Sequence, residues 1–491
     1  MRSKMQSELA DNHGRVGLPA SPRGRQQARL TRHTPVAPRQ KRLYSASDHG
    51  TPVVIPAGLF AAAQRDGGWG PFAESFLRMN RSALEALDVG AELAASSEGI
   101  NVRLVPGGHT GAIPLRSALT GQVAGGFVVR PRFGWSGVGR VLTEIGWQAA
   151  PQFLDLPLVP GSGREVPPWV LAGPVLARFA ELLRALRPGY RDLEAVVRQP
   201  RGTILWGLYA NSSLIRGRWD HLPCRFPDLQ ADTQLRRMVR WALERVHHDL
   251  VAVGGRDPIA LTLALIAAQL LDGLRDVKPL MPARDELYRT LGSRELFDAV
   301  LVRGMEAIAW VLEERGLGGG RELDGLAWHL PLDRLWEAYV EAIVRRETAL
   351  TGGEVRVARR GETTFPVLWS NPIHRSLGHL APDIVVRRRG SVRVIDAKYK
   401  AHLAELDEIG WHRFAAAAQE AHRADLHQIL AYAALYEAED ITATLIYPLR
   451  HNTWQALRER GQDISSADLL RGGRRIRLEL RGAPFGRVDP D

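Results

Sequence analysis

The chain has 491 residues, of which 45% are hydrophobic and 24% are charged, so it has enough length for several domains with sizeable cores. Its single cysteine excludes a disulfide framework, a four-cysteine zinc site and an iron–sulfur cluster held by this chain alone. Because the sequence contains neither a long apolar run nor a secretory signal pattern, we expect a soluble cytoplasmic protein with no membrane partner.

The formal net charge of +11 indicates a nucleic-acid partner, but the charge is unevenly distributed. Residues 1–50 contain ten Lys or Arg and three Asp or Glu, which gives +7 and leaves only +4 for the rest of the chain. This segment is rich in Arg, Pro, Ser and Gln and poor in large apolar residues, so we predict a disordered basic tail. Such a tail would hold DNA without sequence preference, or would equally be a solvated extension or a misassigned start.

Residues 51–165 are predicted to form a β-rich N-terminal domain. A helix is expected over residues 70–87, and short strands punctuated by glycine are expected over 101–105, 111–115 and 126–132, followed by a helix over 137–145. Residues 151–174 contain six prolines, which predicts a semi-rigid connector.

Residues 166–320 are predicted to be mostly helical. Apolar spacing predicts helices over 175–186 and 294–314, Asp232 is the expected N-cap of a helix between them, and the almost wholly apolar segment 258–274 predicts a buried helix. A group of arginines in this region would either line a path for DNA or occupy exposed helix faces: Arg198, Arg201, Arg216, Arg236, Arg237 and Arg240.

A glycine-rich segment at residues 316–320 marks the boundary of a last domain, residues 321–491. Its predicted elements are a helix over 331–349, a strand over 353–359, two strands in the 380s and 390s, a helix over about 413–437 and a strand over 441–447. This α-β-β-β-α-β order predicts a multi-domain protein of the α/β class.

Two strands joined by a basic turn bring together three charged residues in the last domain. Asp383 begins the first strand, and alternation along the second strand places Asp396 and Lys398 on one face. Two carboxylates provide hard oxygen ligands that can hold Mg²⁺ against a phosphate. Opposite charges on a strand are also common as a solvated pair, but only five of the 65 basic residues are lysine, which favours a specific role for the compact ammonium of Lys398.

These residues resemble the PD-(D/E)xK nuclease superfamily and, within it, the McrC family, the nuclease subunits of McrBC-type modification-dependent restriction systems. Leu335–Val340 resembles the family's FE-x-Y-V helix, and Asp425–Tyr432 resembles its D-x-x-Q-x-x-A-Y helix. Arg201–Ile204 and Asp232–Arg237 are similar to its RG-x-I and D-T-x-x-N-R segments. Two positions depart from the pattern: Arg236 replaces an asparagine, and Arg132 replaces the lysine that usually follows the proline.

The resemblance implies a restriction-endonuclease-like core in the C-terminal domain and a DNA endonuclease that uses Mg²⁺, with Mn²⁺ as a possible substitute. Asp383, Asp396 and the carbonyl of Ala397 would bind the metal, and Lys398 would position the attacking water. Glu337 would orient a metal-bound water. Gln428 and Tyr432, one turn apart on a helix, would support Lys398 or contact the DNA backbone.

The resemblance also implies partners and a setting in prokaryotic antiviral defence. The chain would cleave double-stranded DNA when driven by a separate McrB-like AAA+ GTPase hexamer, which would dock on the N-terminal domain and would itself recognise the modified base. Two alternatives remain open from the sequence. One is a RecB-like repair nuclease that acts on DNA ends, and the other is a non-catalytic adaptor that activates a motor.

Overall fold

A strand lies inside the segment predicted to be a disordered tail. The computed structural model describes residues 42–55, 70–96, 99–147, 149–162, 166–186, 189–230, 233–255, 257–291, 298–312, 324–370, 376–400, 416–471 and 474–486, and the predicted tail up to residue 41 lies outside them. β1 (Arg42–Ser47) pairs in parallel with β6 (Val123–Arg130), so the predicted tail extends too far. Since its partner strand is far along the chain, no local pattern signals β1.

Residues 41–491 form one compact unit. Two sheets make up the N-terminal part of this unit. One sheet has the strand order β1-β6-β5-β11-β7, and the other has the order β2-β4-β3. The remaining strands are β2 (Val53–Ile55), β3 (Val89–Ser96), β4 (Gly99–Pro106), β5 (His109–Arg116), β7 (Gln152–Phe153) and β11 (Trp328–Pro331). Helix α2 (Gly70–Ala86) buries Phe76 and Leu84 in the apolar cluster that both sheets share, and α3 (Gly134–Glu144) follows β6.

β11 follows the glycine-rich segment at which we predicted a domain boundary, yet it pairs with β5 and β7. The N-terminal sheet therefore includes residues from beyond that boundary. The next helix, α10 (Leu332–Thr351), starts directly after β11. In this way the N-terminal sheet leads without a linker into the C-terminal elements.

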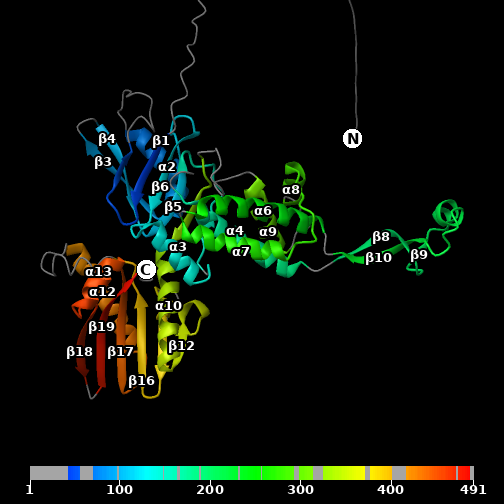
Figure 1. The fold of residues 1–491 in the computed structure, drawn as a ribbon. Coiled ribbons are helices and arrows are strands. Elements are labelled where there is room, and N and C mark those ends of the chain that lie inside the picture. The colour runs from blue at the N-terminus through cyan, green and yellow to red at the C-terminus, as the bar shows by residue number, and fades with distance from the viewer. Residues whose placement is uncertain are drawn as a thin grey trace, which may run out of the picture. The chain divides into compact units, whose positions relative to one another are not determined.

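Helices of the middle region lie side by side (Figure 1) and pack on a large apolar core. They are α4 (Pro168–Ala185), α6 (Gln234–Gly254), α7 (Pro258–Asp272), α8 (Arg284–Leu291) and α9 (Ala299–Leu312). The predicted cap Asp232 lies outside the described residues, and α6 is capped by Thr233, whose hydroxyl accepts a hydrogen bond from the backbone N–H of Arg236. α7 is not wholly buried as predicted: Leu261 and Leu265 are exposed, because α4 and α6 cover only part of its surface. Within the described chain, no helix combines the length and apolar character needed to cross a bilayer.

The middle region also contains a small antiparallel sheet that the helical prediction missed (Figure 1). β8 (Gly189–Val197) pairs with β10 (Leu222–Gln230) along its whole length, and β9 (Thr203–Ile204) adds to the other edge of β10. A short helix α5 (Trp206–Leu208) and a π-helical turn, Tyr209–Leu214, lie between β9 and β10. Burial alternates along β10, where Cys224 and Phe226 are buried and Arg225 and Pro227 are exposed, and this period-two pattern was a strand signal that the helical prediction overlooked.

A six-stranded sheet forms the C-terminal part, in the order β12-β15-β16-β17-β19-β18. Its strands are β12 (Glu354–Val357), β15 (Ile384–Arg388), β16 (Ser391–Ala397), β17 (Asp440–Leu449), β18 (Ile464–Arg471) and β19 (Arg474–Pro484). Figure 1 shows β16, β17, β19 and β18 side by side. Shorter pieces are a 3₁₀ turn Ala358–Arg360, β13 (Phe365–Pro366), β14 (His379–Leu380) and helix α13 (His451–Glu459).

Helices cover both faces of this sheet. Ile384 and Ile395 join the core that includes α10, whereas Val385 and Val394 face the cluster that includes α12 (Ala416–Ala433). α12 connects β16 to β17, and these two strands run parallel, as a helical crossover requires. The protein is therefore a multi-sheet α/β protein.

Candidate active site

The predicted hairpin is present, and it brings Asp383 to the end of the neighbouring strand. β15 and β16 are antiparallel, with Ile384 opposite Ile395, so the start of β15 lies beside the end of β16. The backbone N–H of Ala397 donates a hydrogen bond of 2.9 Å to Oδ2 of Asp383. Asp383 is thus fixed beside the last residues of β16.

Asp396 and Lys398 are neighbours, as strand alternation predicts. Nζ of Lys398 lies 2.6 Å from Oδ2 of Asp396. Asp396 is only 2% exposed, so this ion pair with the ammonium is shielded from solvent. This buried carboxylate lies where a metal ligand is predicted.

Helix α12 presents Gln428 and Asp425 to Lys398, and Tyr432 on the same helix supports Gln428. Nζ of Lys398 donates to Oε1 of Gln428 at 2.8 Å, and Nε2 of Gln428 donates to the hydroxyl of Tyr432 at 3.0 Å. Asp425, one turn before Gln428, receives hydrogen bonds of 2.8 Å from Lys400 on both oxygens and lies 3.8 Å from Nζ of Lys398. Gln428, predicted to support Lys398, thus contacts it directly.

Asp425 was not among the predicted site residues. Its spacing of three residues from Gln428 places both on one helix face, which was the available signal, but its partner Lys400 could be identified only from the fold. The ion pair between Asp425 and Lys400 holds the residues just after β16 against α12.

Glu337 lines a cavity together with Asp383. This cavity has a volume of about 520 Å³, and Arg334, His379 and Gln152 also contribute to it. The indole N–H of the preceding Trp336 donates a hydrogen bond of 3.1 Å to the backbone carbonyl of Ile446 on β17, and Trp336 is fully buried. This contact fixes α10 on the sheet and sets the direction in which Glu337 points.

The site carries more negative charge than its cations neutralise. Burial, the Asp396 carboxylate and Glu337 raise the pKa of Asp383 well above its usual value. Burial by surrounding atoms and the carboxylates of Asp333 and Asp396 raise the pKa of Glu337 to about 7, although the side chain still reaches solvent at the cavity mouth. Carboxylates crowded in this way favour a bound cation.

The pKa of Lys398 responds to the same carboxylates. Burial alone would lower it, but attraction to Asp396, with smaller contributions from Asp425 and Asp383, raises it above the usual value. Lys398 is therefore protonated at neutral pH and is the ammonium group of the site.

The residues present fit a Mg²⁺ ion by their donor chemistry. No three His, Cys, Asp or Glu side chains in the described ranges are already gathered as a metal-binding group. Mg²⁺, however, keeps several waters and is usually held by only one or two carboxylates. Asp383 and Asp396 supply two, and they lie close enough that the charge of Asp396 raises the pKa of Asp383.

A side chain from the N-terminal sheet reaches the residue after Lys398. The hydroxyl of Tyr399 donates a hydrogen bond of 3.0 Å to Asp48, which follows β1 and is 1% exposed. Asp48 also accepts a 2.5 Å hydrogen bond from the backbone N–H of Arg132, whose guanidinium lies 4.5 Å from the centre of the Tyr399 ring. Asp48 and Tyr399 are 351 residues apart, so no sequence pattern could reveal this contact.

Four of the arginines considered as a path for DNA have contacts within the protein: Arg198 lies 3.7 Å from Asp220, Arg201 packs over the ring of Phe226, and Arg236 and Arg240 bind backbone carbonyls. Arg240 donates to the backbone carbonyls of Leu274, Arg275 and Val277, and Arg236 donates to the carbonyl of Leu186. For these two side chains, the structure favours a role in joining helices.

The chain matches known proteins at the level of a family model and of solved structures. The model of the McrBC 5-methylcytosine restriction system component family matches residues 176–448. A refined half-complex from a tetradecameric assembly of Thermococcus gammatolerans McrB AAA+ hexamers with bound McrC is 13% identical, with a TM-score of 0.38 over 91% of this chain and 96% of that chain. A structure of the Thermococcus gammatolerans McrBC complex is 11% identical, with a TM-score of 0.26 over 65% of this chain and 90% of that chain. Among curated protein sequences, none matches the chain significantly.

Proposed function

Because the chain belongs to the McrBC 5-methylcytosine restriction system component family, as the motifs indicated, we propose that it is the nuclease subunit of such a system. It would hydrolyse phosphodiester bonds of double-stranded DNA in the cytoplasm in a reaction that depends on Mg²⁺. The observation that carries this proposal is the meeting of Asp383, Asp396 and Lys398 at the ends of two paired strands. A solvated structural ion pair would not need a second, half-buried carboxylate beside it.

The order of elements around the site supports a PD-(D/E)xK core. α10, β12, β15, β16, α12 and β17 follow one another as the α-β-β-β-α-β succession predicts, apart from the short β13 and β14. The sheet places the end of β16 next to α12, which supplies Gln428, and α10 supplies Glu337 from the other face. The fold thereby gathers charged and polar groups from four separate elements.

In this proposal Asp383 and Asp396 hold the metal, with the carbonyl of Ala397 as a third ligand. A bound Mg²⁺ would polarise the phosphate and lower the pKa of a coordinated water. The N–H of Ala397 keeps one oxygen of Asp383 in place, so the other oxygen stays available as a ligand.

Lys398 and its neighbours act on the water and on the phosphate. The ammonium of Lys398 lies against Asp396 and is held by Gln428, so it is positioned to steady the attacking water and the negative charge that develops on the phosphate. Glu337, with a pKa of about 7, would accept a hydrogen bond from a water in the cavity and orient it.

Replacing Asp396 by Asn tests the assignment. We expect no detectable cleavage of double-stranded DNA containing 5-methylcytosine when the full-length variant is mixed with its AAA+ partner, GTP and Mg²⁺. Asp440→Asn, at the exposed start of β17 in the same sheet, is the matched control and should cleave normally. Normal cleavage by Asp396→Asn at saturating Mg²⁺ would contradict the active-site assignment and leave the adaptor alternative.

We further propose that an McrB-like AAA+ GTPase hexamer docks on the N-terminal part, residues 51–165. Hydrogen exchange of the full chain, with and without the purified partner, checks this proposal. Protection is expected in the described strands β2, β3 and β4, together with stimulation of GTP hydrolysis. Protection confined to residues 189–230, where Trp206, Ile215 and Trp219 are exposed, would instead assign docking to the small antiparallel sheet.

A further inference from the structure

Two histidines of the N-terminal sheet bring their ring nitrogens close together. Nδ1 of His109, at the start of β5, lies 3.4 Å from Nδ1 of His329 on β11, and the ring centres are 5.2 Å apart. Both side chains are only half-buried, so small ions in solution can reach them. The proposed nuclease site uses neither of them.

The strand register creates this pair. His329 lies opposite Gly111, which is two residues after His109 in β5. Because alternate residues of a strand share a face, both histidines project from the same face of the sheet. Gly111 allows the strands to lie this close, since a Cβ there would collide with the carbonyl oxygen of Trp328 and lie 2.8 Å from Cα of His329. The short distance between the two rings is thus fixed by the backbone.

A third donor atom comes from the end of helix α2. The backbone carbonyl of Ala86, the last residue of α2, lies 3.2 Å from Nδ1 of His109. Carbonyls in the last turn of a helix have no partner within the helix and lie at the negative end of its dipole. The end of α2 therefore favours a cation beside the two histidines.

Hydrogen bonding leaves these three atoms short of protons. The carbonyl of Ala86 can only accept, so Nδ1 of His109 must carry the proton that it donates, and Nδ1 of His329 can only share this same proton. Three atoms with lone pairs then surround a single hydrogen. A metal ion in its place would use the lone pairs of all three, with the proton of His109 moved to its other ring nitrogen.

The distances match those between ligands of one metal ion. Two ligand atoms at about 2.0–2.1 Å from a tetrahedral Zn²⁺ are about 3.4 Å apart, and the separations here are 3.4 Å and 3.2 Å. Imidazole nitrogen suits Zn²⁺, Ni²⁺ and Cu²⁺. Burial, His109 and Arg334 lower the pKa of His329, so its ring is neutral at pH 7 and keeps the lone pair that a metal needs.

We propose that His109, His329 and the carbonyl of Ala86 bind a divalent transition metal of the Zn²⁺ type, at a position that we call the β5–β11 site. No third His, Cys, Asp or Glu side chain of the described ranges joins them, so water completes the coordination. The ion ties α2, β5 and β11 together. Because β11 leads directly into α10, the ion also fixes the start of that helix. The inference does not depend on the proposed nuclease function.

The test is Zn²⁺ binding by the full-length chain, measured by competition with a chromogenic chelator. The starting chain carries Asp383→Asn and Asp396→Asn, so that the candidate active-site carboxylates do not compete for the ion. Adding His329→Gln should weaken the binding of one Zn²⁺ ion at least about tenfold, because one of two imidazole ligands is lost. His109→Gln should have the same effect. Binding that neither substitution changes would overturn the proposal.

Melting temperatures separate a lost ligand from a damaged fold. Zn²⁺ should raise the melting temperature of the starting chain by a few degrees, since a ligand that binds only the folded state stabilises it. The rise should be much smaller for His329→Gln and for His109→Gln, while all three chains melt at similar temperatures in EDTA. A rise of equal size in all three would contradict the site.

Two further measurements locate the ion. Hydrogen exchange of the wild-type chain needs no substitution, and Zn²⁺ should slow exchange in β5 and β11. His248→Gln removes an exposed histidine of α6 and should leave Zn²⁺ binding unchanged. Equal loss of binding in this control, or protection absent from β5 and β11, would show that the ion binds elsewhere. If the wild type bound Zn²⁺ and the starting chain did not, the ion would belong to the candidate active site and the β5–β11 assignment would be wrong.

Discussion

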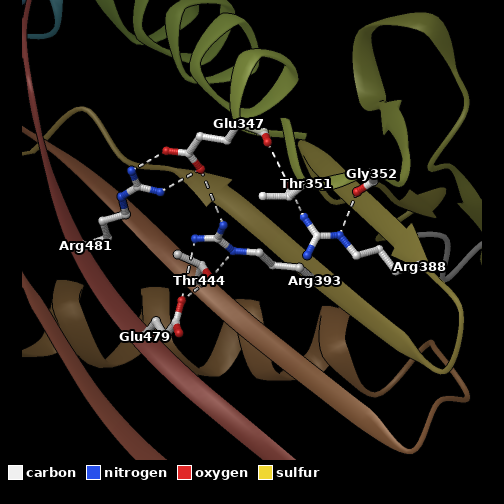
Figure 2. A network of polar contacts seen from close by, with 8 residues as sticks. All are labelled: Glu347, Thr351, Gly352, Arg388, Arg393, Thr444, Glu479 and Arg481. Atoms are coloured by element: carbon white, nitrogen blue, oxygen red, sulfur yellow. Dashed lines mark hydrogen bonds and ion pairs between the residues drawn. The ribbon is translucent and has the colours of Figure 1, made fainter. Parts of the chain in front are cut away.

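The charged side chains at the two ends of strand β16 differ in how completely they are paired. At its carboxyl end, Asp383, Asp396 and Glu337 outnumber the ammonium of Lys398, and the pKa values of Asp383 and Glu337 are raised. At its start, acidic and basic side chains are matched. Figure 2 shows Arg393 between Glu347 and Glu479, with Arg481 on the other side of Glu347.

The matched network joins five elements of the C-terminal part, α10, β15, β16, β17 and β19. Arg481 of β19 makes two hydrogen bonds to Glu347 of α10, one of them 3.0 Å long. Arg393 of β16 donates to Oγ1 of Thr444 at 3.2 Å, and this hydroxyl donates to Glu479 at 3.2 Å. Arg388 donates to the carbonyl of Gly352, just after α10, at 2.7 Å. These contacts fasten α10 to the sheet.

The comparison separates a structural charge cluster from one suited to chemistry. Burial opposes the charge of Glu347, but the hydrogen bonds and charge of Arg481, with Arg393, lower its pKa. A carboxylate near the start of β16, that of Glu347, is therefore stabilised in its charged form. A carboxylate at the carboxyl end, that of Asp383, is destabilised in its charged form. A functional site keeps such uncompensated charge because its ligand completes the balance.

The largest expected effect is that of Asp383→Asn. Cleavage should fall by at least about a thousandfold, roughly 4 kcal/mol of activation barrier, because the metal loses a ligand. Since the folded-state pKa of Asp383 is raised, its charge costs stability as pH rises. The variant should therefore melt at a higher temperature than the wild type at pH 8 without Mg²⁺, and this gain should vanish near pH 4. A lower melting temperature at pH 8 would show that the charge of Asp383 stabilises the fold, as that of Glu347 does.

Lys398→Arg should also be strongly impaired, with a loss of about a hundredfold or more, equal to roughly 3 kcal/mol of activation barrier. A planar guanidinium cannot replace a compact ammonium between Asp396 and Gln428. Single-turnover cleavage at saturating DNA measures the effect. Full activity of this variant would show that Lys398 serves only as a structural charge.

At the other end of β16, Glu347→Gln should have the opposite signature. The free energy of unfolding should fall by about 2 kcal/mol at pH 7, because Arg393 and Arg481 lose a charged hydrogen-bond partner. A lowered folded-state pKa stabilises the protein above the normal pKa of Glu, so the difference from the wild type should narrow as pH falls below about 4. Urea unfolding at pH 7 and pH 4 measures this difference. If Glu347→Gln lost cleavage without losing stability, Glu347 would act in the reaction and would not be a structural residue.

The smallest effect is expected for Tyr399→Phe. This variant tests whether Tyr399, the residue directly after Lys398, has a structural role and no role in cleavage. The variant loses the hydrogen bond to Asp48 but keeps the ring against Arg132. We expect the free energy of unfolding to fall by about 1 kcal/mol, while cleavage changes by only a few-fold. A hundredfold loss of cleavage with native stability would instead show that contact with the N-terminal sheet sets the position of Lys398.

The sequence by itself determined the hairpin and the pairing of Asp396 with Lys398. Strand alternation has a fixed period of two, so residues 396 and 398 must lie on one face once the strand is recognised. The helix that carries Glu337 was also readable, because its apolar stripe includes Leu335, Trp336 and Tyr339, which are buried against the sheet. These predictions succeeded because each depends on interactions within a short segment.

Only the tertiary structure decided which distant residues meet. β1 in the predicted tail and β11 beyond the predicted boundary both join the N-terminal sheet, since strand pairing depends on backbone hydrogen bonds between remote segments. The contacts of Asp48 with Tyr399 and of Asp425 with Lys400 likewise have no local signal. Periodicity records which side of an element is buried, whereas the identity of the neighbour that covers it is set by how the whole chain packs.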